Sequence, residues 1–175
     1  MLPLANVQQY DIGRAARAQV TYVRDGLSVT CSHFLHPDRP ADELTVLREL
    51  PAPPGARELS VAAALPDLGQ PVQLLWEQQG FRTVHPATVA RIEADSFAVF
   101  VGFAPPATLQ GLSGALCWGG TSALGVVTGC QRRLKHAYLW VSPIKLDQNP
   151  PPRTESGGPQ PQPGSTIHQP SCSST

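Results

Sequence analysis

Residues 108–115 read TLQGLSGA, with a G-x-S-G turn at their centre. The apolar runs 97–101 and 123–128 flank this segment, so we expect the turn to connect β-strands. Gly111 lets the backbone turn so that its own N–H and that of Ser113 point toward one position. Two convergent N–H donors can stabilise a developing oxyanion. The stretch therefore predicts a strand–loop–strand arrangement with a candidate nucleophile at Ser113, although the same residue types also occur in ordinary turns.

Short apolar runs separated by Gly, Pro and Asp clusters recur along the whole chain of 175 residues. Such spacing is typical of all-β proteins, and no window shows the apolar stripe of a long helix. The pattern predicts two small antiparallel β-barrels with a cleft between them. We expect strands near residues 17–24, 27–35, 43–49, 58–65, 71–78, 81–93, 96–103, 115–118, 123–131 and 136–144.

Composition divides the chain into four parts. We expect an N-terminal arm at 1–14, a first barrel at 15–78, a second barrel at 79–148 and a tail at 149–175. The tail is rich in Pro, Ser and Gly and carries almost no aliphatic side chains, so we expect it to be disordered or a linker. Its PPPR segment could dock in an aromatic groove of a partner or act as a plain spacer.

A candidate general base follows the apolar run that begins at Leu27. His33 comes directly after the small residues at the end of this run, which would hold it at the rim of the first barrel. A base must lie on a rigid element within hydrogen-bond reach of the nucleophile. We therefore expect His33 to approach Ser113 across the cleft.

The acid that would orient this histidine is less sharply defined by the sequence. Glu58 lies directly before a short apolar run, where its carboxylate could accept a hydrogen bond from the second ring nitrogen of His33. A solvent-exposed charge at the start of a strand is an equally ordinary interpretation. The alternative acids are Asp67, Asp38, Asp42 and Glu43.

The order His33, Glu58, Ser113 resembles that of the chymotrypsin-like serine proteases of positive-strand RNA viruses. Residues 108–114 match the T-x-x-G-x-S-G pattern of sobemovirus and polerovirus proteases. The segments VTCSH, which ends at His33, and VSPIKL at 141–146 are similar to arterivirus main serine proteases. The resemblance covers about residues 15–146. It implies the two-barrel fold, a serine endopeptidase mechanism and a polypeptide substrate, with the protein's own viral polyprotein as the expected target.

The resemblance also assigns an oxyanion hole and a first specificity pocket. Gly111 and Ser113 would supply the oxyanion donors, and the pocket would be formed by Ala107, Thr108, Val127, Thr128 and Gly129. Val127 stands where relatives that cleave after Glu or Gln have a histidine. Because no acidic residue lies in these segments to pair with Lys or Arg, we expect a small or apolar residue before the cleaved bond, or one contacted through His136 or Thr108.

Two departures from the family pattern support a second hypothesis. Residues 20–26 lack the G-x-G-F-like hairpin that these proteases usually carry ahead of the histidine. Leu112 stands where secreted digestive proteases have an aspartate that pairs with a freed N-terminus, so activation by trimming is not implied. The alternative is a catalytically inactive interaction module on the same scaffold.

Charge and cysteine usage restrict the remaining function classes. The 13 basic and 13 acidic residues give a net charge of zero, so we expect no nucleic-acid partner. The chain has no apolar run of membrane-spanning length and no signal-peptide profile, so we expect a cytoplasmic, non-secreted protein that reaches membranes only through a longer precursor. The four cysteines lack zinc-site spacing and a disulfide pattern. We expect buried free thiols, no metal and no cofactor.

Overall fold

The computed structural model describes residues 1–12, 16–102, 111–133, 136–146 and 173–174. The expected all-β fold is confirmed. Apart from a 3-10 turn at Leu4–Asn6 and the one-turn helix α1 (Ser32–Leu35), the elements in these ranges are strands. No helix in the described ranges is long and apolar enough to cross a membrane.

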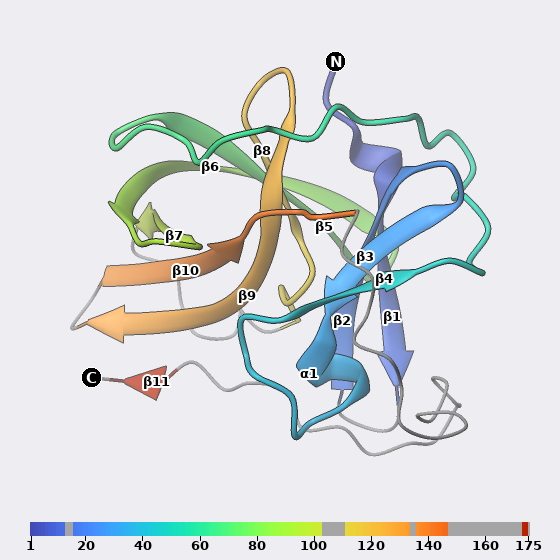
Figure 1. The fold of residues 1–175 in the computed structure, drawn as a ribbon, viewed down its shortest axis with the longest axis horizontal. Helices are drawn as coiled ribbons and strands as arrows, with labels where there is room; N and C mark the ends of the chain where they lie inside the picture. The colour runs from blue at the N-terminus through green and yellow to red at the C-terminus, as the bar shows by residue number, and fades with distance from the viewer. Residues whose placement is uncertain (13–15, 103–110, 134–135, 147–172, 175) are drawn as a thin grey trace.

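The first half of the molecule is a four-stranded antiparallel sheet, drawn on the right in Figure 1. Its strands follow chain order: β1 (Val7–Ile12), β2 (Ala16–Arg24), β3 (Leu27–Cys31) and β4 (Leu44–Leu47). Asp25 and Gly26 make the tight turn between β2 and β3, with φ angles of 50° and 73°. Asp and Gly tolerate this left-handed region better than other residues.

The second half is a closed six-stranded barrel, drawn on the left in Figure 1. Its neighbours run β10-β7-β6-β5-β8-β9, and pairing of β9 with β10 closes the ring. The strands are β5 (Pro71–Gln78), β6 (Phe81–Ile92), β7 (Phe97–Gly102), β8 (Leu116–Trp118), β9 (Ala123–Arg133) and β10 (His136–Ser142). A two-residue strand, β11 (Ser173–Ser174), pairs in parallel with β9.

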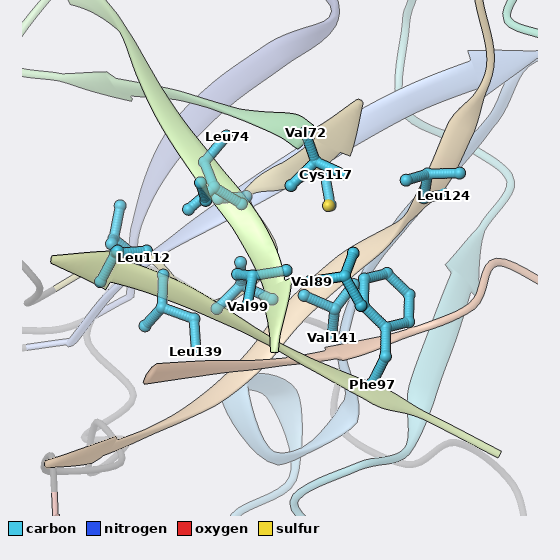
Figure 2. Packing of buried hydrophobic residues seen from close by; sticks show 14 of the residues in the cluster. Val72, Leu74, Val89, Phe97, Val99, Leu112, Cys117, Leu124, Leu139 and Val141 are labelled. Carbon is cyan, nitrogen blue, oxygen red and sulfur yellow. The ribbon is translucent and has the colours of Figure 1, made fainter. Parts of the chain in front are cut away.

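The two halves share buried apolar surface. One core fills the barrel, and Figure 2 shows its packing around Leu74, Val99 and Phe97. A second core joins Val23 and other residues of the first sheet to Leu75 and other residues of the barrel. Leu74 and Leu75 are neighbours on β5 and point into different cores, as the twofold repeat of a strand requires. This shared packing fixes the position of the first sheet relative to the barrel.

The structure corrects the expected domain boundaries. β5 lies in the second barrel, so the boundary expected after residue 78 is wrong. The turn at Gln79 and Gly80 folds β5 onto β6 as a hairpin, and β5 also pairs with β8. The N-terminal segment is not an arm, because residues 7–12 form β1 and pair with β2.

The expected strands 27–35 and 58–65 also differ from the observed elements. Residues 32–35 form α1, because the His36 N–H donates to Ser32 O at 2.8 Å and closes one helical turn. The run 58–65 makes only the isolated bridge from Val61 to Ala123. Its alanines lack the branched or aromatic side chains that stabilise strands.

The cysteines and the tail depart in part from expectation. Cys31 and Cys117 are buried free thiols, as expected. Cys130 on β9 is disulfide-bonded, so the expectation that all strand cysteines are free thiols was wrong. Ser173 and Ser174 pair with β9 next to Cys130, whereas residues 149–172 of the tail lie outside the described ranges.

Candidate active site

The segment that carries Ser113 is fixed at every backbone carbonyl from Gly111 to Gly114. The Gly111 and Gly114 φ angles of 79° and 88° allow the tight path of the chain. Each carbonyl accepts one hydrogen bond: Gly111 O from Gln19 Nε2 (3.1 Å), Leu112 O from Ala115 N (2.8 Å), Ser113 O from Gln19 N (2.6 Å) and Gly114 O from Thr21 Oγ1 (2.9 Å). We call residues 111–115 the serine loop.

Two N–H groups of the serine loop are left available. Those of Gly111 and Ser113 donate to no atom of the described residues, whereas Gly114 N donates to Val127 O at 2.7 Å. The Ser113 side chain is half-buried. The loop therefore combines a half-buried serine with two N–H groups that have no acceptor among the described residues. Such donors can stabilise an oxyanion where they converge.

Leu112 and Gly114 explain why this sequence forms the loop. Leu112 is only 3% exposed and packs in the barrel core near Val99 and Leu139 (Figure 2). Burial of a leucine of this kind contributes about 1.5–3 kcal/mol. A Cβ at Gly114 would lie 1.8 Å from Gln19 O, so only glycine fits there. The leucine anchors the loop in the barrel, and the glycine allows it to approach β2.

His33 lies on α1 and is 6% exposed. Neither ring nitrogen has a hydrogen-bond partner in the described part of the chain. Burial is the larger effect and lowers the pKa of His33 below its ordinary 6.5, whereas the nearby backbone of Ala41 acts in the opposite direction. The imidazole is therefore neutral at pH 7 and able to accept a proton.

The histidine and serine segments meet at one carbonyl of β9. Val127 O accepts from Gly114 N at 2.7 Å and from Cys31 Sγ at 2.9 Å. Gly114 directly follows Ser113, and Cys31 lies two residues before His33, a chain length of at most about 7 Å. Burial raises the pKa of the Cys31 thiol to about 12, so Cys31 remains a protonated donor and is not a competing nucleophile.

The chain that follows α1 is attached to the barrel. The Ser142 hydroxyl donates to the backbone oxygen of Asp42 at 2.9 Å and lies 3.5 Å from Thr128 Oγ1. Ser32 N also donates to Glu43 O at 2.8 Å, which ties α1 to the same segment. The short helix is thus held between the first sheet and the barrel wall.

Glu58 is not hydrogen-bonded to His33 in this structure. Its side chain is exposed, and both ring nitrogens of His33 are without partners among the described residues. The next residue, Leu59, is buried with Val23 and donates its N–H to Val23 O at 2.8 Å. Leu59 is therefore held in the core, whereas its neighbour Glu58 is exposed to solvent.

None of the alternative acids is hydrogen-bonded to His33 among the described residues either. Glu43 makes a two-point ion pair with Arg39, including Oε2 to Nε at 2.7 Å. This hydrogen bonding lowers the pKa of Glu43. Asp38, Asp42 and Asp67 are exposed.

The expected specificity pocket is described only in part. Val127 and Thr128 are buried, and Val127 belongs to the barrel core. A Cβ at Gly129 would meet no described atom within 4 Å. Ala107 and Thr108 lie outside the described residues.

Sequence reasoning missed the residues that hold the serine loop. Gln19 and Thr21 lie two apart on β2 and are buried, so they share one face of the strand. Thr30 Oγ1 on β3 donates to Gln19 O at 2.9 Å. The available signal was the polar alternation within an otherwise apolar strand, which indicates a polar contact surface but does not name its partner.

Comparisons with known proteins found similarity to solved structures only. No family model matches the chain, and no curated protein matches it by sequence. The active form of the Rv3671c protease from M. tuberculosis is similar with a TM-score of 0.59 and 16% identity, covering 81% of this chain and 77% of that one. The inactive form of the Rv3671c protease is similar with a TM-score of 0.56 and 16% identity, covering 79% of this chain and 84% of that one.

A viral enzyme shows the same likeness. The serine protease of a human pathogenic astrovirus is similar with a TM-score of 0.52 and 14% identity, covering 77% of this chain and 87% of that one. At these identities the likeness concerns the fold. The chain therefore has the two-barrel fold of the chymotrypsin-like serine proteases.

Proposed function

We propose that the protein is a serine endopeptidase in which Ser113 is the nucleophile and His33 the general base. The observation that supports this most strongly is the serine loop, where all four carbonyls are engaged and the Gly111 and Ser113 N–H groups donate to no described residue. The buried, neutral His33 lies two residues after Cys31, whose thiol donates to the same Val127 O that accepts from Gly114 N.

The proposed reaction follows from these groups. Ser113 Oγ attacks the carbonyl carbon of a peptide bond while a ring nitrogen of His33 takes its proton. The N–H groups of Gly111 and Ser113 bind the oxyanion, with each donor contributing about 3–4 kcal/mol to the barrier. His33 then gives the proton to the leaving amine, and water hydrolyses the acyl-enzyme by the same route.

We propose Glu58 as the acid that orients His33. Its support is its place in the His–acid–Ser order and the hydrogen bond from Leu59 to Val23 on β2, which holds this segment against the sheet whose strand β3 leads into α1. Catalytic hydrogen bonds are often long or absent in a free enzyme and form in the substrate complex. In this proposal the Glu58 side chain turns toward His33 when substrate is bound.

The proposed substrate is a polypeptide with a small or apolar residue before the cleaved bond. The absence of an acidic residue at 127–129, together with a glycine at 129 whose added Cβ would meet no described atom within 4 Å, supports this preference. The resemblance to viral proteases supports a polyprotein as the natural substrate. A cleavage profile dominated by Lys or Arg at this position would contradict the assignment.

A specific observation also favours a second candidate, a non-catalytic interaction module. His33 has no hydrogen-bond partner in the described part of the chain, and Glu58 is exposed. A scaffold that had lost catalysis would tolerate both features, because nothing would require an oriented imidazole.

Labelling with a fluorophosphonate probe separates the two candidates. The wild type is compared with Ser113→Ala and His33→Ala, and circular dichroism confirms that each variant is folded. The peptidase proposal expects labelling of the wild type alone. Folded wild-type protein that does not label, and does not hydrolyse peptide libraries, would support the interaction module instead.

A further inference from the structure

Gln19 is a buried amide whose side-chain groups are all used. It lies on β2, is 2% exposed, and points between the two halves of the molecule. Its Nε2 donates to Glu77 O at 2.8 Å, and its Oε1 accepts from Glu77 N at 3.0 Å. The amide thus pairs with the backbone of β5 much as a neighbouring strand would.

The second N–H of this amide goes to the serine loop. Nε2 also donates to Gly111 O at 3.1 Å, so one side chain connects the loop to the backbone of β5. The main chain of Gln19 adds two further restraints. Its N–H donates to Ser113 O at 2.6 Å, and its carbonyl oxygen limits residue 114 to glycine.

The side-chain contact acts at the position where the loop has most conformational freedom. Gly111 has a φ of 79°, and a glycine rotates more freely than any other residue. Its carbonyl belongs to the peptide unit between the two candidate oxyanion donors, Gly111 N and Ser113 N. Fixing that carbonyl fixes the backbone that connects the donors, and misplacement by about 1 Å can cost on the order of 10²-fold in rate.

We propose that Gln19 is a positioning residue that holds the two oxyanion donors in register by joining Gly111 to the β5 backbone. This inference rests on the proposed function for its catalytic consequence, whereas the ordering of the loop is a property that can be measured without activity. No other natural side chain of this length combines an uncharged acceptor with two donors.

Asn6 provides a matched control. It is also a fully buried amide on the first half of the molecule. Its Nδ2 donates to Tyr22 O at 2.9 Å and to Arg57 O at 2.6 Å, and its Oδ1 accepts from Arg57 N at 3.2 Å. Asn6 makes no hydrogen bond to the serine loop, so its replacement disturbs a similar network at another place.

The test compares Gln19→Met with Asn6→Leu, and uses Gln19→Ala in the same comparison if Gln19→Met does not fold. We expect Gln19→Met to lower kcat for a peptide ester, or the fluorophosphonate labelling rate, by about 10- to 100-fold with KM changed less than about threefold. Asn6→Leu should change both constants by less than about threefold. Hydrogen exchange of amides 111–115 should become about tenfold faster in the Gln19 variant only.

In these experiments the positioning role of Gln19 and the proposed function can fail independently of each other. If the wild type neither labels nor hydrolyses peptides, the proposed function fails, and faster exchange in the Gln19 variant alone still supports the positioning role. Equal exchange of residues 111–115 in the Gln19 and Asn6 variants would overturn it. In an active enzyme, Gln19 and Asn6 variants with equal kcat would overturn it as well.

Discussion

The serine loop and the helical turn that carries His33 are built in contrasting ways. In the loop, four consecutive carbonyls are hydrogen-bonded, and Leu112 anchors the chain in the barrel core. In α1, the backbone is tied down by Ser32 and His36, but the functional side chain has no hydrogen-bond partner in the described part of the chain. The nucleophile is held in place, whereas the base is only buried.

This difference shows which part of the candidate site is positioned by the fold alone. Backbone and side-chain hydrogen bonds, together with a buried leucine, organise the loop without any charged group. Orientation of an imidazole requires a partner for a ring nitrogen, and Glu58 does not occupy that place here. We expect the serine loop to be rigid in the free protein and the base to become oriented only with substrate.

The largest effect is expected from Glu58→Gln. If the carboxylate orients His33 in the substrate complex, this change should lower the labelling rate by about 10³- to 10⁴-fold. The unfolding midpoint should stay unchanged, because the side chain is exposed. Kinetics of fluorophosphonate inactivation and urea unfolding measure the two quantities. Asp67→Asn, at another exposed acid, is the control, and equal rates for the two variants would exclude Glu58 as the acid.

The next largest effect is expected on stability from Gly114→Ala. The added Cβ would lie 1.8 Å from Gln19 O at a φ of 88°, so both overpacking and backbone strain oppose it. We expect a loss of about 3–5 kcal/mol in the free energy of unfolding, measured by urea denaturation. Gly26→Ala has a similar φ of 73° but no atom within 4 Å, so its loss should be about 1–2 kcal/mol. Similar losses at the two glycines would show that the loop does not press against β2.

A smaller loss is expected from Leu112→Ala. Removal of this side chain from the barrel core should cost about 2–4 kcal/mol in the free energy of unfolding. Leu68→Ala is the control, because Leu68 is 68% exposed and should change stability by less than about 0.5 kcal/mol. If Leu112→Ala were as stable as Leu68→Ala, the loop would not be anchored through the core.

The smallest effect is expected from His33→Leu. This change removes two ring nitrogens that have no hydrogen-bond partner among the described residues. We therefore expect stability at pH 7.5 to be unchanged or higher by about 1 kcal/mol. A substantial loss in urea unfolding at this pH would indicate that the imidazole makes a stabilising contact.

The pH dependence of stability sharpens this prediction. The pKa of His33 is lowered in the folded state, so the unfolded chain binds the proton first as the pH falls. The contribution of neutral His33 to the free energy of unfolding is therefore fully present above about pH 6.5. It decreases below that pH, by at most about 1.4 kcal/mol per pH unit. His33→Leu should remove this decrease between about pH 6.5 and 5, whereas His36→Gln should retain it. The lowered pKa of Glu43 affects stability only below its ordinary 4.5.

The sequence predicted the strands well, because apolar alternation and turn residues are local signals. It also indicated the turn in the serine loop, where Gly111 and Gly114 have positive φ angles. The partners of that loop could not be predicted: Gln19 lies far from Gly111 along the chain, and only the folded structure brings them together. Assignment of β5 to the wrong barrel has the same origin, because a strand's pattern does not specify its neighbours.

The acid was the least predictable part of the site. A carboxylate beside an apolar residue can point to either side of the chain, and in the structure Leu59 is buried whereas Glu58 is exposed. The disulfide at Cys130 was missed for a similar reason, since pairing depends on which segments meet on β9.

The most direct test of the central claim, that His33 is the base of Ser113, is the pH dependence of fluorophosphonate inactivation measured beside an NMR titration of the His33 ring. The rate should fall as the pH drops through a single apparent pKa below 6.5, and this value should equal the one obtained for His33 by NMR. A rate that does not change between pH 5 and 8, or a pKa that differs from that of His33, would contradict the claim.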